Sequence, residues 1–281
     1  MRNIFQACAQ AYAEGEPVAL AMVIRASPSS RAGEKMLVYR DGSTEGRFWD
    51  DRLTDYVCQA GLAALTGGVS SRLAYVQSES GFVQAAPGDE GDVEIFIQVL
   101  QPSPTLLLIG AGHIGEALVR MSKLLGWHVV VVDDRADFIT PERLPDADER
   151  ILVRYEPHGE SLDPMPVSIT PTTFILLATW GWDEPALRQV VNTPAAYIGL
   201  VASARKSIII FRDLMKEGIS PDVLARVRVP TGLDLGAETP SEIALSILAE
   251  MLMVQRGATG MPLAQSKGSA VMTQSTKGVK K

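Results

Sequence analysis

The first hundred residues contain short apolar stretches separated by turn signals. Runs rich in valine and isoleucine are typical of buried strands, and an apolar residue every three to four positions is typical of a helix. Strands are predicted at Val18–Arg25, Lys35–Arg40, Arg72–Gln77 and Val93–Val99, and helices at 3–14 and Asp50–Leu65. This mixture predicts a smaller N-terminal α+β domain over residues 1–101, which ends at Gln101-Pro102-Ser103-Pro104 because proline restricts the chain.

After Pro104 the pattern changes to strands that alternate with helices. Strands are predicted at Thr105–Gly110, His128–Asp133, Ile151–Arg154, Thr173–Thr179, Ala196–Ser203 and Val227–Pro230, and helices at His113–Leu125, Glu184–Asn192, Arg205–Glu217 and Ser241–Gln255. Such alternation requires crossover connections and is typical of a parallel sheet. Residues 105–257 are therefore predicted to form a Rossmann-like α/β domain. Residues 258–281 are rich in polar residues and lysine, which predicts a disordered tail.

Composition excludes several classes of protein. The formal net charge is −7, which argues against a nucleic-acid surface, and no apolar run reaches the roughly 18 residues of a membrane span. Gln6, Gln10 and Glu14 follow the N-terminus too soon for a signal peptide, so the cytoplasm is the expected location. Cys8 and Cys58 lie in predicted helices and are interpreted as structural thiols. With three scattered histidines and no paired cysteines, a protein-borne metal site is not expected.

The main candidate site is the turn Gly110-Ala111-Gly112-His113-Ile114-Gly115. It follows an apolar strand and opens a helix, as the dinucleotide-binding glycine motif requires. Gly110 permits the tight turn, Gly112 lets a phosphate approach the backbone, and Gly115 lets helix and strand pack closely. The free N–H groups at a helix N-terminus attract an anion. His113 either donates to that phosphate or faces solvent.

Acidic and basic residues at other predicted strand ends extend this candidate site. Asp133 closes the second strand, where a carboxylate can accept from ribose hydroxyls, and Asp134 is a close competitor. Arg205 and Lys206 open a helix, where the dipole disfavours cations unless an anion is bound or an acid pairs with them. Asp234 and Glu238 either face a ligand or serve a turn and a helix start.

Three segments resemble the xanthine dehydrogenase accessory factors, the XdhC/CoxI family. They are Leu108–Gly115 with Val131-Val-Asp-Asp-Arg135, Tyr197–Val201 with Ser203 and Arg205-Lys206, and Gly232-Leu-Asp-Leu-Gly-Ala-Glu-Thr-Pro240. The N-terminal domain matches more loosely, through Gly15–Leu20, Ser29-Ser30 and Gly33-x-Lys35-Met36. The resemblance implies a cytoplasmic, homodimeric accessory factor or chaperone that is not itself an oxidising enzyme.

The resemblance also implies a ligand and partners. Members of the family bind the molybdenum cofactor, a pterin, help it acquire a sulfido ligand, and deliver it to a molybdenum hydroxylase such as xanthine dehydrogenase. A cysteine desulfurase is a further candidate partner. The cofactor-binding residues expected on this basis are Gly110, Gly112, His113, Ile114, Gly115, Asp133, Asp134, Ser203, Arg205, Lys206, Asp234 and Glu238.

The sequence departs from the family pattern in three places. The family's Gly-Gly-Cys-Val-Glu stretch corresponds to Gly46–Leu53, which has no cysteine, so a thiol ligand to molybdenum from that position is excluded. The usual Thr-Arg-Gly-His reads Thr179-Trp-Gly-Trp182, and the usual Gly-Ser-Arg-Arg-Lys reads Ala202-Ser-Ala-Arg-Lys206. Two other functions stay open: an NAD(P)-dependent oxidoreductase, which needs a proton-transfer residue that the sequence does not show, and a nucleotide-binding regulatory module.

Overall fold

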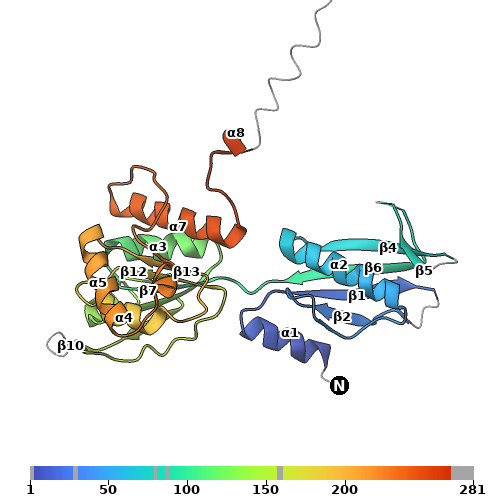
Figure 1. Cartoon of the computed structure of the whole chain (residues 1–281), viewed down its shortest axis with the longest axis horizontal. Coiled ribbons are helices and arrows are strands. Elements are labelled where there is room, and N and C mark those ends of the chain that lie inside the picture. Colours follow the sequence, from blue (N-terminus) through green and yellow to red (C-terminus); the bar gives the residue numbers. More distant parts are fainter. Residues whose placement is uncertain (1–2, 28–30, 79–80, 87–88, 157–160, 267–281) are drawn as a thin grey trace, which may run out of the picture. The chain divides into compact units, whose positions relative to one another are not determined.

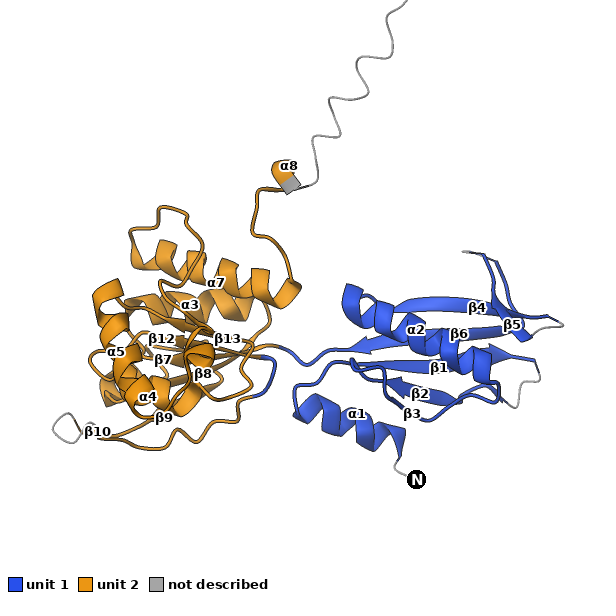
Figure 2. Cartoon of the chain, viewed as in Figure 1, with its two compact units in different colours: residues 1–103, 170–172 blue, residues 104–169, 173–281 orange. Residues whose placement is uncertain are grey.

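The computed structural model describes residues 3–27, 31–78, 81–86, 89–156 and 161–266, so Ser29, Ser30 and the tail beyond 266 lie outside the described residues. The chain divides into two compact units (Figure 2). Unit 1 comprises residues 1–103 with 170–172, and unit 2 comprises residues 104–169 and 173–281. No helix among the described residues is long and apolar enough to cross a membrane.

Unit 1 is an antiparallel sheet with one helix on each face. Its elements are α1 (Ile4–Ala13), β1 (Val18–Ala26), β2 (Lys35–Val38), β3 (Thr44–Glu45), α2 (Asp51–Gly67), β4 (Ser71–Ser78), β5 (Gly81–Gln84) and β6 (Val93–Leu100). The strand order is β3-β2-β1-β6-β4-β5. Side chains alternate between the faces, so Met36 and Val38 pack with α2, whereas Leu37 packs with α1. The predicted α+β domain is confirmed.

Unit 2 is a parallel sheet between two layers of helices (Figure 1). Its strands are β7 (Thr105–Ile109), β8 (His128–Asp133), β9 (Glu149–Leu152), β12 (Thr173–Leu177), β13 (Tyr197–Leu200) and β14 (Val227–Arg228). Its helices are α3 (His113–Leu124), α4 (Asp183–Val190), α5 (Ala204–Lys216), α6 (Pro221–Leu224), α7 (Pro240–Arg256) and α8 (Leu263–Ser266). All five strand pairs are parallel, which confirms the predicted Rossmann-like sheet.

The helices of unit 2 separate by face because the strand side chains alternate. Leu106 and Leu108 of β7 pack with the side chains of α3 and α7, whereas Leu107 and Ile109 pack with those of α4 and α5. Residues Ala136–Phe138 form a 3₁₀ helix, and a small antiparallel pair, β10 (Tyr155–Glu156) and β11 (Ser161–Leu162), precedes β12. The helix α8 lies within the segment predicted to be disordered.

The strand order β14-β13-β12-β7-β8-β9 fixes where a ligand can bind. The chain builds outward from β7 through β8 to β9, and then returns to the other side of β7 to form β12. In open α/β sheets, ligands bind outside the carboxyl ends of the strands, at the point where the strand order reverses. That point lies between the loops that follow β7 and β12.

Candidate functional site

The glycine loop, residues 110–115, joins β7 to α3 at the reversal point. Gly110 has φ +105°, and a Cβ atom there would lie 2.3 Å from the carbonyl oxygen of Ala178. Its N–H donates to the carbonyl of Val132 at the end of β8 (2.8 Å). Only glycine satisfies both the backbone angle and this close approach. Gly115 serves packing, because a Cβ there would lie 2.8 Å from the carbonyl oxygen of Gly110.

Gly112 opens the helix without a side-chain cap. The N-cap side chain accepts a backbone N–H in α1, α2, α5, α6 and α7, whereas α3 starts at Gly112 with no such bond. The first N–H groups of a helix have no intrahelical acceptor, so those of His113 and Ile114 need another partner. A Cβ at Gly112 would meet none of the described atoms within 4 Å. The loop therefore combines unpaired donors with open space, which suits an anion.

Asp133 holds the glycine loop in place. Its buried carboxylate accepts the Ala111 N–H (2.6 Å) and three N–H groups of Arg135, from the backbone (2.9 Å), Nε (2.8 Å) and Nη2 (2.8 Å). A carboxylate offers about four lone-pair sites, so this arrangement leaves none for a ribose hydroxyl. Burial raises the pKa of Asp133, but the bonds from Arg135 and Ala111 outweigh burial and hold it below its ordinary value. We assign Asp133 a positioning role in place of the ribose contact predicted from sequence.

An aromatic stack extends this arrangement from β8 to the first turn of α3. The guanidinium carbons of Arg135 and Arg143 lie 3.5 and 3.7 Å from the ring centroid of Phe138. Two guanidiniums this close to one centroid must lie on opposite faces of the ring, because on one face they would overlap. Arg143 Nε also donates to Glu116. Asp133 and Glu116 therefore tie the glycine loop and α3 to one rigid group of side chains.

The loop after β12, residues 178–183, is also tightly held. Asp183 is buried, and its carboxylate accepts the Thr179 hydroxyl (2.8 Å) and pairs with Lys206. The indole N–H of Trp182 donates to Asp134 (3.0 Å), whose pKa is raised by burial. Because the sheet order is β12-β7-β8, this bond joins loops on either side of the glycine loop. Asp134 thus lies beside the predicted site, and Lys206 supports the loop after β12.

The other predicted cations and polar residues of this edge have varied surroundings. Ser203 caps α5 by accepting the Lys206 N–H, so its hydroxyl is committed to the helix. Arg205 and His113 are exposed, and neither has a partner among the described residues. Ile114 is half-buried and packs against the core shared by α3 and α7.

The loop from Gly232 to Thr239 is positioned by a buried acid that sequence reasoning missed. Glu250 of α7 accepts the Gly232 N–H (2.8 Å), the Tyr197 hydroxyl (2.6 Å) and an Arg228 N–H (2.9 Å). Its signal in the sequence is an acid seven residues after Ile243, on the apolar stripe of the helix. Asp234 and Glu238 are exposed, and within the described part of the chain neither carboxylate has a hydrogen-bond or ion-pair partner.

Unit 1 has an aromatic cluster where the family pattern has its cysteine. Trp49 packs edge-on against Phe48 and Phe82, and Arg31 lies 5.1 Å from its ring. Cys8 and Cys58 are both half-buried, and burial raises the pKa of each thiol. Because the thiolate is the form that binds metals and attacks electrophiles, these thiols are poor candidates for either role.

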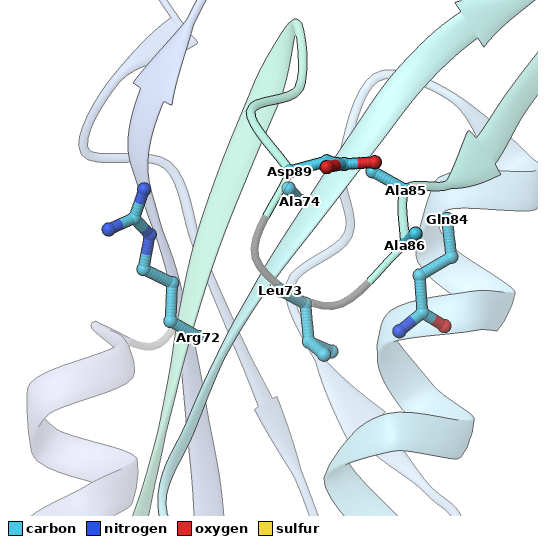
Figure 3. Close-up of a pocket in the computed structure, with 7 residues that line it drawn as sticks. All are labelled: Arg72, Leu73, Ala74, Gln84, Ala85, Ala86 and Asp89. Atoms are coloured by element: carbon cyan, nitrogen blue, oxygen red, sulfur yellow. The ribbon is translucent and has the colours of Figure 1, made fainter.

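A pocket in unit 1 lies at the strands β4 and β5 (Figure 3). It is lined by Arg72, Leu73, Ala74, Gln84, Ala85, Ala86 and Asp89. The Arg72 guanidinium points away from Ala85 and Ala86, and it pairs with the buried Glu94 (2.7 Å). The cation that lines this pocket is therefore already neutralised, and the pocket has no anion-binding character comparable to that of the glycine loop.

The two-unit architecture and the glycine loop define a protein with a Rossmann domain. Residues 106–251 match the family described as the XdhC Rossmann domain, and residues 11–76 match the XdhC and CoxI family. The chain belongs to the XdhC and CoxI family, as its resemblance predicted.

Two relatives extend this similarity. The chain is 34% identical over 260 residues to the uncharacterized protein YqeB of Escherichia coli K12, which covers 92% of the chain and 47% of YqeB. It is 28% identical over 172 residues to a Bacillus subtilis protein named as a probable xanthine dehydrogenase component, covering 60% of the chain and 48% of that protein. The chain thus spans about half the length of each relative. A crystal structure of a xanthine dehydrogenase from Bacillus halodurans matches 92% of this chain and 97% of that chain, with 19% identity and a TM-score of 0.48.

Proposed function

We propose that this chain is an accessory factor that binds the molybdenum cofactor and delivers it to a molybdenum hydroxylase such as xanthine dehydrogenase. The observation that carries the proposal is the start of α3 at Gly112, which lacks a side-chain cap and faces open space. The phosphate end of a pterin or of its nucleotide form fits this position. Family membership and the name of the Bacillus subtilis relative support the choice of cofactor and client.

The same site gives less support to an NAD(P)-dependent oxidoreductase. Ribose recognition in such proteins uses an acid at the end of the second strand, but the Asp133 carboxylate is already saturated by Arg135 and Ala111. Asp134 is the remaining acid at that strand end, and it is bound to Trp182. A nucleotide-binding regulatory module would use the glycine loop alone, so it is separated from our proposal by the identity of the ligand and by transfer.

The handling of the cofactor by this chain is that of a carrier. In the proposed complex, the N–H groups of His113 and Ile114 hold the phosphate, while Asp133 and Arg135 keep the loop in its binding geometry. The cofactor is cargo, so no residue of the chain needs to act as an acid or base during transfer. A homodimer, a cytoplasmic location and a cysteine desulfurase as sulfur donor are parts of the same proposal.

A transfer assay tests this function. The protein would be loaded with molybdenum cofactor released from a purified hydroxylase and mixed with cofactor-free xanthine dehydrogenase. We expect recovery of xanthine oxidation that depends on the chain and is abolished by Gly112→Val. Recovery that is equal with and without the chain, or equal with wild type and Gly112→Val, would contradict the proposal.

A further inference from the structure

Trp180 lies on the loop after β12 and is 87% exposed. An indole is a large apolar surface, and leaving it in water forgoes the stabilisation of about 1.5–3 kcal/mol that burial of a large apolar side chain gives. The fold does not use Trp180 for packing, whereas the neighbouring Trp182 is 1% exposed. A single exposed apolar residue needs no explanation by itself. The position of Trp180 and the rigidity of its loop are what distinguish it.

Hydrogen bonds hold the loop on both sides of Trp180. The Thr179 hydroxyl donates to Asp183 (2.8 Å), and the Trp182 N–H donates to the Thr179 hydroxyl (3.3 Å). The carbonyl of Gly181 accepts the Tyr155 hydroxyl (3.3 Å). Trp180 is thus presented by a fixed turn, so little backbone entropy would be lost when a ligand contacts it.

The turn flanks the reversal point of the sheet. Its first residue, Ala178, contacts the glycine loop so closely that a Cβ at Gly110 would lie 2.3 Å from its carbonyl oxygen. On the other side, the bond from Trp182 to Asp134 reaches the loop after β8, past the carboxyl end of β7. The loop that carries Trp180 therefore borders the position assigned to the ligand phosphate.

We infer that Trp180 is a stacking residue for the planar heteroaromatic ring of a phosphorylated ligand whose phosphate occupies the glycine loop. This inference rests on the proposed function and adds the recognition of the ring. A tryptophan face suits flat π-systems, and stacking of a nucleic-acid base on an aromatic side chain contributes about 1–3 kcal/mol. Asp134 adds a carboxylate beside the loop, which can accept an N–H from the edge of such a ring. A pterin and a nucleobase share this chemistry.

Three small probes separate the two ring types from the phosphate. Neopterin monophosphate carries a pterin ring, CMP carries a pyrimidine, and ribose 5-phosphate carries no ring. Each would be titrated by calorimetry into wild type, Trp180→Ala, Trp180→Phe and the control Leu124→Ala. Leu124 at the end of α3 is also 87% exposed, so its variant removes equal exposure away from the site.

We expect Trp180→Ala to weaken binding of at least one ring-bearing probe by about 5- to 100-fold, which is the stacking contribution expressed as affinity. Trp180→Phe should recover much of this loss, while ribose 5-phosphate binding and the Leu124→Ala variant should match wild type. The probe with the larger loss identifies the ring. Quenching of the exposed Trp180 emission by that probe is a second readout, which a purely structural role would not produce.

Three outcomes would overturn the inference. They are equal affinity of wild type and Trp180→Ala for both ring-bearing probes, an equal loss for ribose 5-phosphate, or loss of cofactor transfer with unchanged ring affinity, which would place the indole against the client protein. Ring binding that depends on Trp180 in a protein without transfer activity would support stacking and refute the proposed function. Transfer that survives Trp180→Ala with unchanged affinity would do the reverse.

Discussion

Alanine at Gly110 and alanine at Gly112 should affect different properties of the protein, although the two glycines are two residues apart. At Gly110, φ is +105° and the new Cβ would lie 2.3 Å from a backbone oxygen. The backbone angle costs about 1–3 kcal/mol and overpacking about 1–3 kcal/mol. The expected loss of about 2–6 kcal/mol is large against a typical total of about 5–15 kcal/mol.

At Gly112 the same change should leave stability almost unchanged. Its φ is −73°, and the Cβ would meet nothing described within 4 Å. Alanine is a poorer N-cap than glycine by roughly 0.5–1.5 kcal/mol, but glycine gives the unfolded chain extra freedom of about 0.4–1 kcal/mol. These terms nearly cancel. In the complex, the Cβ would occupy the space where the phosphate approaches, so at least one charge-assisted hydrogen bond of about 1.5–3 kcal/mol is lost.

Urea unfolding and calorimetry measure the two effects separately. The buried Trp127 and Trp182 report on unit 2, so their fluorescence follows the unfolding of the unit that carries the loop. We expect Gly110→Ala to lower the urea midpoint clearly, and Gly112→Ala to keep it while binding ribose 5-phosphate at least about 10-fold more weakly, the equivalent of one such hydrogen bond. Gly112→Val should remove binding altogether. A Gly112→Val protein that binds as tightly as wild type would show that the loop is not the phosphate site.

Three further predictions concern residues around this loop and in unit 1. Lys206→Ala should lower the free energy of unfolding by about 1–3 kcal/mol because it leaves the buried Asp183 unpaired, whereas Arg205→Ala should change it by less than about 0.5 kcal/mol; unchanged stability in Lys206→Ala with weaker ligand binding would instead assign Lys206 to the anion. Asp133→Asn should destabilise the protein at neutral pH but less in acid, because a folded-state pKa below the ordinary value near 4 gives stabilisation that is present above that value and is lost as pH falls through the lowered pKa; a stability difference that is constant with pH in urea titrations would contradict this. Replacing Cys8 and Cys58 together by alanine should leave cofactor transfer intact with some loss of stability, and loss of transfer by a stably folded variant would mean that a thiol takes part.

The parts of the fold that depend on local pattern were predictable from the sequence. The glycine loop is one example, because its strand, its turn and its helix start are contiguous. The limits of β1 and α7 differ from the predictions by one residue at their ends for the same reason. The two-residue strands β3, β10 and β11 were missed, since so short a run carries no periodicity.

The partners of the charged side chains were not predictable. Asp133 stands where a ribose acceptor would stand, and the sequence does not say whether its carboxylate turns outward to a ligand or inward to Ala111 and Arg135. Lys206 and Asp183 are 23 residues apart and meet only because α4 and α5 pack on the same face of the sheet. Trp180 departs from the family pattern, but its exposure depends on how the loop folds.

The cofactor content of the purified protein tests the central claim most directly. The chain would be produced in cells that make the molybdenum cofactor, and molybdenum and oxidised pterin would be measured in wild type and in Gly112→Val, with circular dichroism as the folding control. The account predicts that molybdenum and pterin copurify with wild type and fall to background in the folded Gly112→Val variant. Copurification of NAD(P) in place of the pterin, or equal molybdenum content in both proteins, would contradict it.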